Sequence, residues 1–302
     1  MAEEGSGPRY APYTAPLKPF SIGLAALDPS RWIDVAGDLD AYLDEKRRLL
    51  AAHPAQVWQE IEGSTAAQQE ALDLVLDHLL TDHAALYRRS GTLVEVSNRK
   101  VDLADGTIPA LQKAGFLIAD GLVVLEKKDA GWTITAGFVA FPSGWSLPEK
   151  AGLPMEGVHA HVPGFQAGTR NATLVNRIFD NLRPDLPAIR FNWSIYPEGE
   201  LYWPPERGAR ADRENPVARN HFIRIERQTL RRLPRTGAIL FTIRIDQDPL
   251  GLLRRPGNSA LANALAAKLR ELTQEQLAYK GMTARRDALL AYLEAAADDP
   301  AP

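Results

Sequence analysis

Two strand-like runs joined by a short turn constrain the fold of this 302-residue chain more than any other feature. Residues 220–246 read NHFIRIERQTLRRLPRTGAILFTIRID, and β-branched and aromatic residues recur on both sides of Leu-Pro-Arg-Thr-Gly. Strands that follow each other in the chain through a short turn pair in antiparallel fashion. The chain is therefore expected to contain an antiparallel sheet.

Two further segments predict hairpins of the same kind. Residues 122–127 and 132–141 flank a Lys-Asp-Ala-Gly turn, and residues 188–205 contain a Pro-Glu-Gly turn. Between the two hairpins, residues 173–182 have the spacing of a short helix. The residues expected on its apolar face are Leu174, Ile178 and Leu182.

Helical periodicity occurs on both sides of the strands. Apolar residues recur at spacings of three and four from about residue 38 to residue 87, and again in 258–281 and 283–297. Helices at both ends of such a chain can cover the faces of the sheet. The order of elements therefore predicts an α+β fold.

Charge and hydropathy exclude several classes of partner. The 35 Lys and Arg residues against 38 Asp and Glu residues give a net charge of -3, which offers no basic footprint for a nucleic acid. No uninterrupted apolar run approaches the roughly 18 residues that a membrane span requires. The first residues are acidic and then rich in glycine and proline, unlike a secretory signal, so we expect a cytoplasmic protein.

The chain contains no cysteine, which limits the metal chemistry that is available. A cysteine-ligated iron–sulfur cluster, a cysteine nucleophile and haem attached through C-x-x-C-H are all excluded. Any haem would have to be bound non-covalently, with histidine, tyrosine or methionine at the iron.

A histidine pair stands out in the segment GLPMEGVHAHVPGF, residues 152–165. With Glu156, the pair His159 and His161 could form a non-haem iron or zinc site of two histidines and one carboxylate. One histidine could instead ligate a haem, or both could be turn residues. The spacing alone leaves these three readings open.

Alternation along three strands predicts a polar side of the sheet opposite an apolar side. A half-solvated sheet and a polar pocket under a helical cover would both produce this pattern. The polar residues that share a face within their own strand are Arg190, Asn192, Ser194 and Tyr196 in the first, Arg224, Glu226 and Gln228 in the second, and Thr242, Arg244 and Asp246 in the third.

Five segments, in this order, resemble the alpha subunit-like family of haem-dependent oxidative N-demethylases. They are FPSGW, EKAGLPMEGVHAHVPGF, RFNWSIYPEGELYWP, IRIERQTLRRLPRTGAILFTIR and LAYKG. The similarity runs from about Pro16 to Leu293, and ERQTLRRLPRTGAILFTIR is its most specific part. The resemblance implies a haem-binding, PAS-like antiparallel sheet of five to six strands with N- and C-terminal helical extensions.

The resemblance also implies how the chain is divided. Residues 1–25 are expected to form an irregular arm, and residues 26–302 a single haem-PAS-like domain. Within that domain, 26–90 would be a helical extension, 91–247 the sheet core with an inserted helix, and 248–302 the C-terminal helices.

The activity that the family implies is oxidative N-demethylation of a small secondary amine such as dimethylamine, a monooxygenase-type reaction. O₂ would be activated at a non-covalent, His-ligated haem b, with electrons from a separate reductase subunit that carries flavin and an iron–sulfur cluster. The lack of a dinucleotide-binding fingerprint in this chain agrees with imported electrons. A haem-PAS gas sensor without catalysis remains the alternative, although no output module is evident.

The resemblance assigns a role to one histidine, and the polar strand faces suggest roles for other residues. His159 matches the histidine of the family motif I-H-x-P-V-P and would be the axial ligand, whereas His161 stands where the family usually has proline. On the strands, Arg224 would donate hydrogen bonds to oxygen as its charge increases, and Glu226 would hold the protonated amine. A cross-strand ion pair between Arg224 and Glu226 is the structural alternative.

The remaining candidates have supporting roles. Asn192 and Thr242 would orient the amine and oxygen. Arg190, Arg231 and Arg235 would bind the haem carboxylates, and the two arginines near the turn could instead dock an acidic reductase or simply be solvated.

Overall fold

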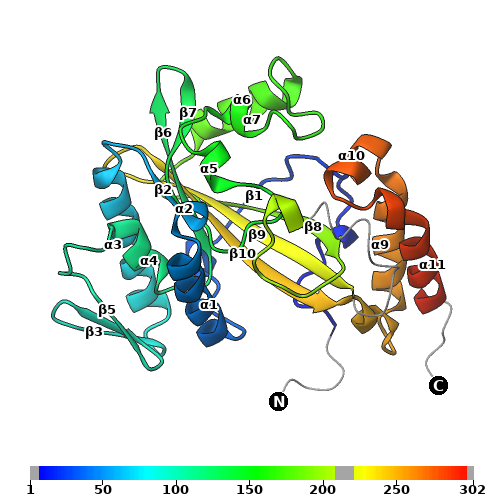
Figure 1. Cartoon of the computed structure of the whole chain (residues 1–302), viewed down its shortest axis with the longest axis horizontal. Helices are drawn as coiled ribbons and strands as arrows, with labels where there is room; N and C mark the ends of the chain where they lie inside the picture. The colour runs from blue at the N-terminus through cyan, green and yellow to red at the C-terminus, as the bar shows by residue number, and fades with distance from the viewer. Residues whose placement is uncertain (1–6, 208–220, 298–302) are drawn as a thin grey trace.

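The computed structural model describes residues 7–207 and 221–297 as an α+β structure built around an antiparallel sheet (Figure 1). The sheet order is β1-β8-β9-β10-β6-β7-β2, so two short edge strands extend the five to six strands that were expected. The strands are β1 (Ala25–Ala26), β2 (Trp58–Glu60), β6 (Gly121–Lys128), β7 (Gly131–Phe138), β8 (Ala188–Tyr196), β9 (Phe222–Arg232) and β10 (Ile239–Pro249).

The β9–β10 hairpin is confirmed, and a buried carboxylate stabilises its turn. Glu70 accepts hydrogen bonds from the backbone N–H groups of Arg235 and Thr236 at 2.6 and 2.7 Å. Gly237 has a φ of 71°, in the left-handed region that glycine adopts without strain. Its N–H donates to the carbonyl oxygen of Leu233 at 3.0 Å and closes the turn.

The register of this hairpin decides which residues share a face. Thr242 lies opposite Thr229, whereas Glu226 on β9 lies opposite Asn192 on β8. Cross-strand partners project to the same side of a sheet. Thr242 therefore projects to the side opposite Glu226, and the polar residues of the three strands do not form one common face.

We call the two sides the cavity face and the back face. The cavity face carries Val123 and Leu125 of β6, Phe241 and Ile243 of β10, Glu226, Gln228 and Leu230 of β9, and Arg190, Asn192 and Ser194 of β8. The back face carries Leu122 and Val124 of β6, Leu240, Thr242 and Arg244 of β10, Ile225, Arg227 and Thr229 of β9, and Trp193 and Ile195 of β8.

Helices from both ends of the described chain cover the back face. One hydrophobic cluster joins α1, α3 and α4 to Leu122, Val124 and Leu240, and a second joins α9 and α11 to Trp193 and Ile225. Figure 1 shows the first group at the left of the sheet and the second at the right. The α-helices of the two ends, together with α4, are α1 (Leu39–Ala52), α2 (Pro54–Val57), α3 (Thr65–Asp82), α4 (Ala110–Gly115), α9 (Ser259–Glu271), α10 (Gln274–Tyr279) and α11 (Arg286–Ala297), of which α10 also reaches the other side of the sheet.

The segment between β7 and β8 covers the cavity face. It contains α5 (Leu147–Lys150), α6 (Met155–Val158) and α7 (Arg170–Asn181), the helix predicted for 173–182. The apolar face predicted for this helix is wrong at Leu174, which is 38% exposed. Val175 and Phe179 are buried against the sheet instead, because the helix is rotated by one residue from the predicted orientation.

Two other regions differ from the sequence-based expectations. The Pro-Glu-Gly segment does not close a hairpin: β8 pairs with β9, and residues 200–205 contribute only the isolated bridge between Ser143 and Trp203. Prolines 197, 204 and 205 leave little of this segment able to donate ladder hydrogen bonds. A separate three-stranded sheet was not foreseen; its strands are β3 (Tyr87–Ser90), β4 (Leu93–Val96) and β5 (Arg99–Asp102).

Among residues 7–207 and 221–297, no helix is long and apolar enough to cross a membrane.

Candidate functional site

A cavity of about 1040 Å³ lies between the cavity face of the sheet and the α5–α7 segment. Ligand pockets commonly measure roughly 300 to 1,000 Å³, so this one has room for a large cofactor and a small substrate. Much of its wall is apolar, including Val123, Leu125, Phe165, Leu230 and Phe241. An apolar wall of this kind excludes water from whatever binds there.

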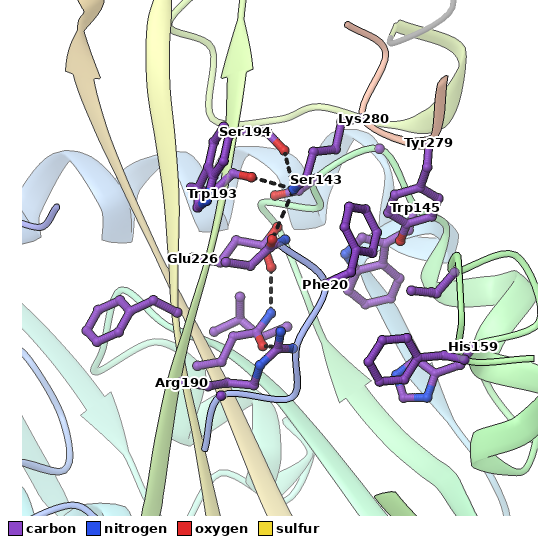
Figure 2. Close-up of a pocket in the computed structure, with 18 of the residues that line it drawn as sticks. Phe20, Ser143, Trp145, His159, Arg190, Trp193, Ser194, Glu226, Tyr279 and Lys280 are labelled. Atoms are coloured by element: carbon purple, nitrogen blue, oxygen red, sulfur yellow. Dashed lines mark hydrogen bonds between the residues drawn. The ribbon is translucent and has the colours of Figure 1, made fainter. Parts of the chain in front are cut away.

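His159 enters the cavity from the covering segment. It caps the end of α6, where its N–H donates to the carbonyl oxygen of Met155 at 3.0 Å. Its imidazole lies 5.8 Å from the ring of Phe165 and has no side-chain hydrogen bond to any described residue. Figure 2 shows His159 across the pocket from Arg190 and Glu226.

The surroundings of His159 favour a neutral imidazole. Burial lowers the pKa of His159 to about 4, and the positive charges of Arg190 and Lys150 contribute to this shift. A neutral imidazole with an unused nitrogen is the form that ligates a metal. The imidazole of His159 is therefore uncharged at neutral pH.

The other two residues of the histidine segment do not join His159 in a cluster. Glu156 and His161 are both exposed, although His161, like His159, lines the cavity. Within the described parts of the chain, no three His, Asp or Glu side chains lie close enough together to hold a metal ion. The geometry thus gives no support to a non-haem iron or zinc site made of Glu156, His159 and His161.

A row of polar side chains crosses the opposite wall of the cavity. Arg190 Nη1 donates to Gln228 Oε1 at 3.0 Å, and Gln228 Nε2 donates to Glu226 Oε2 at 2.6 Å. Arg190 Nε is buried without a hydrogen-bond partner among the described residues. The row thus retains a carboxylate and an unsatisfied guanidinium nitrogen, both available to a ligand.

Lys280, which directly follows α10, lies on the same wall of the cavity and contacts β8. Its Nζ donates to Asn192 Oδ1 at 3.1 Å, to Ser194 Oγ at 3.3 Å and to the carbonyl oxygen of Trp193. Burial lowers the pKa of Lys280 to about 8, with Arg190 lowering it further and Glu226 opposing the shift. Figure 2 shows these contacts as dashed lines.

Arg224 has a different role from the one expected. Its side chain is fully buried and donates to the carbonyl oxygens of four residues and to a serine hydroxyl. The partners are Phe141, Pro142, Glu200 and Leu201 through their carbonyl groups, and Ser143 through Oγ at 2.9 Å. No ion pair with Glu226 forms, and Arg224 is not among the residues that line the cavity. It joins two loops, and all three of its guanidinium nitrogens donate to them.

Three more predicted site residues lie away from the cavity. Thr242 is on the back face, where its Oγ1 lies 2.7 Å from Thr229 Oγ1. Arg231 stacks its guanidinium 4.4 Å from the ring centre of Trp32, also on the back face. Arg235, in the β9–β10 turn, pairs with Asp73 of α3.

The structure thus brings together His159, Arg190, Asn192 and Glu226 around one cavity, and separates Arg224, Thr242, Arg231 and Arg235 from it. The pairing of β9 with β10 accounts for the position of Thr242, and the contact with Asp73 of α3 for that of Arg235. Arg231 is five positions from Glu226 on the same strand, so alternation alone turns it to the back face. Because a turn of six residues connects Arg232 to Ile239, even-numbered residues of β10 face the same way as odd-numbered residues of β9.

Several lining residues were not singled out from the sequence. Phe20, Trp145, Tyr279 and Lys280 all line the cavity (Figure 2). Phe20 has a φ of 60°, a region that non-glycine residues rarely adopt, and such strain is often found next to functional sites. Tyr279 and Lys280 belong to the segment LAYKG, which carried part of the family resemblance but no assigned role.

One comparison with known protein families bears on this site. A family model described as "Haem-dependent oxidative N-demethylase, alpha subunit-like" matches residues 23–290. The matched range includes the α5–α7 segment, the strands of the cavity face and Lys280. The resemblance drawn from the five sequence segments is thereby confirmed.

Proposed function

The chain belongs to the haem-dependent oxidative N-demethylase alpha subunit-like family, and we propose that it binds haem through His159 and demethylates a small secondary amine. The family description makes it a haem-dependent oxidoreductase and, as an alpha subunit, a component of a multi-subunit enzyme. The observation that carries the proposal is the unpartnered, neutral imidazole of His159 facing a carboxylate-bearing wall across the cavity.

The residues present fit a haem. The apolar walls suit the faces of a macrocycle, and the imidazole of His159 is a suitable iron ligand in a chain without cysteine. Arg190, with its unsatisfied Nε, and Lys150, whose charge reaches His159, are suited to the haem carboxylates. Haem, when bound, would supply the redox chemistry by which O₂ is activated.

The topology supports a PAS-like core. A first hairpin, β6–β7, is followed by the inserted helices α5–α7 and then by three consecutive strands, β8, β9 and β10. This is the order expected of a haem-binding PAS domain, with the histidine in the insertion and the ligand pocket on the later strands. We accordingly treat residues 26–302 as one haem-PAS-like domain.

The chain's own residues would bind and orient the amine. Glu226 Oε1 has no hydrogen-bond partner among the described residues, so it would accept a hydrogen bond from the protonated amine and hold its proton. The side-chain amide of Asn192, directly opposite Glu226, would orient the substrate. The apolar wall formed by Phe241 and Ile243 would exclude water from the reacting carbon.

Electrons would come from a partner subunit. We propose a reductase that carries flavin and an iron–sulfur cluster, because this chain has neither the cysteines for a cluster nor a dinucleotide fingerprint.

Titration of the purified apoprotein with haem tests the proposal. The wild type should bind one haem and develop the absorption spectrum of a His-ligated iron. His159→Ala should lose this spectrum, whereas His161→Ala should keep it, because His161 is the more exposed of the two histidines that line the cavity. The opposite pattern would assign the ligand to His161, and haem binding unaffected by either change would refute histidine ligation from this segment.

A further inference from the structure

Two cations fix the direction of the hydrogen bonds along the polar row. A guanidinium group has only donors, so the Gln228 atom that lies 3.0 Å from Arg190 must be the amide oxygen. Gln228 Nε2 is thereby directed to Glu226. By the same reasoning, the ammonium of Lys280 requires the amide oxygen of Asn192 to face it, at 3.1 Å.

The atoms left over define what the wall offers to a ligand. With Oδ1 turned toward Lys280, Asn192 has Nδ2 available, and this nitrogen has no hydrogen-bond partner among the described residues. Glu226 likewise keeps Oε1 free, since Gln228 donates to Oε2. Asn192 and Glu226 are cross-strand partners on the cavity face. The wall therefore presents one donor and one acceptor side by side.

Lys280 is itself held in one position. Its Nζ has three oxygen acceptors, from Asn192, Trp193 and Ser194. It also lies 5.2 Å from the ring centre of Phe20 and 5.3 Å from that of Trp193. Since Lys280 directly follows α10, these contacts attach the C-terminal helices to β8 at the cavity.

We propose that Lys280 is a positioning residue that holds the Asn192 amide with its N–H donor facing the cavity next to the free carboxylate oxygen of Glu226. The inference deepens the proposed function and rests on it for the ligand class. The ligand that matches this pair is a small secondary ammonium bound at Glu226, beside a group that accepts a hydrogen bond from Asn192.

A double-mutant cycle on the haem-reconstituted protein tests the proposal, with dimethylammonium chloride as the probe and calorimetry as the readout. Lys280→Met and Asn192→Leu should each weaken binding about tenfold. The double variant should be no weaker than either single variant, because Lys280 acts through Asn192. Lys280→Arg, which also has only donors, should recover most of the affinity.

A second double-mutant cycle of the same two residues measures the free energy of unfolding in urea without dimethylammonium. This cycle distinguishes a failure of the positioning role from a failure of the proposed function. The Lys280–Asn192 contact should give non-additive changes in the free energy of unfolding even if dimethylammonium does not bind. Failure of the probe to bind the wild type would refute the amine substrate class alone. Additive changes in stability would refute the positioning role, and so would additive losses of affinity or a Lys280→Met variant that binds like the wild type.

Lys113→Met is the matched control. Lys113 is also a buried lysine, and its Nζ donates to the carbonyl oxygen of Leu103 at 2.8 Å, in α4 on the back-face side. Loss of the Lys113 ammonium should lower the free energy of unfolding without changing the affinity for dimethylammonium. An equal loss of affinity in Lys113→Met would show that the effect of Lys280→Met is a general consequence of removing a buried lysine.

Discussion

Asn192 on β8 and Glu226 on β9 are direct cross-strand partners on the wall of the cavity, across from His159. An amide and a carboxylate at neighbouring positions can bind a small polar ligand that neither could orient alone. Two flanking cations, Arg190 and Lys280, set the directions of the surrounding hydrogen bonds. The predictions below test the parts of this arrangement separately.

Removing the charge of Glu226 should weaken amine binding. Glu226→Gln preserves the shape of the side chain but loses a charge-assisted hydrogen bond, which contributes about 1.5 to 3 kcal/mol. We expect the affinity for dimethylammonium to fall by a factor of about ten or more, with haem content unchanged. Calorimetry on the haem-loaded variant measures this, and Glu95→Gln in the distant three-stranded sheet provides the control. Equal affinities for Glu226→Gln and the wild type would remove Glu226 from the binding site.

Arg224 should be required for stability and not for ligand binding. Arg224→Met leaves several buried carbonyl groups without a donor, so we expect a loss of about 3 kcal/mol or more in the free energy of unfolding. The folded fraction should bind haem and dimethylammonium like the wild type. Urea unfolding and calorimetry check the two parts, and a stable variant with weakened binding would contradict this assignment.

Haem affinity should depend little on pH in the range where an ordinary histidine titrates. The pKa of His159 is lowered from 6.5 to about 4, so its imidazole stays neutral and protons do not compete with iron until the pH approaches that value. Haem titrations between about pH 5 and pH 8 measure this. A decrease in affinity centred near pH 6.5 would contradict ligation by His159.

The same shift affects the stability of the apoprotein. His159 has a lowered pKa in the folded state, so its contribution to stability is fully present above the ordinary pKa of 6.5 and is lost as the pH falls toward about 4. His159→Gln should reduce the acid sensitivity of the melting temperature over this range. An unchanged pH profile in the variant would show that His159 is more solvated than the structure indicates.

The isolated haem-loaded chain should not oxidise NADPH in response to dimethylamine. Addition of a reductase with flavin and an iron–sulfur cluster should start turnover, measured as formaldehyde release. Amine-dependent NADPH oxidation by the pure chain would show that the electrons enter through a site on this chain.

The sequence predicted the strands well because alternation and turn residues are local properties. The β6–β7 and β9–β10 hairpins and the covering helix α7 all lie close to their expected bounds. The relative orientation of β9 and β10 was not accessible in this way. It depends on how many residues the turn leaves unpaired, and one residue more or less reverses the face of Thr242.

The candidate site was only partly predictable for a related reason. Alternation placed Arg190, Asn192 and Glu226 correctly relative to their own strands, and the family motif selected His159. Lys280 is 88 residues from Asn192 in the chain, so their contact depends on tertiary packing that no local pattern encodes. Arg224 has the same sequence signature as Glu226, but its length lets it reach the loop carbonyls at the end of the sheet.

The N-terminal arm contributes a wall to the cavity that is made only with help from the C-terminal helices. Lys268 donates to the carbonyl oxygen of Leu17 at 2.8 Å, and the ring of Phe20 packs edge-on against Tyr279 at 5.6 Å. During synthesis on the ribosome, residues 17–20 emerge long before residues 268–280. Because both sets of residues are needed for these contacts, this wall of the cavity is among the last of its parts that can form during synthesis.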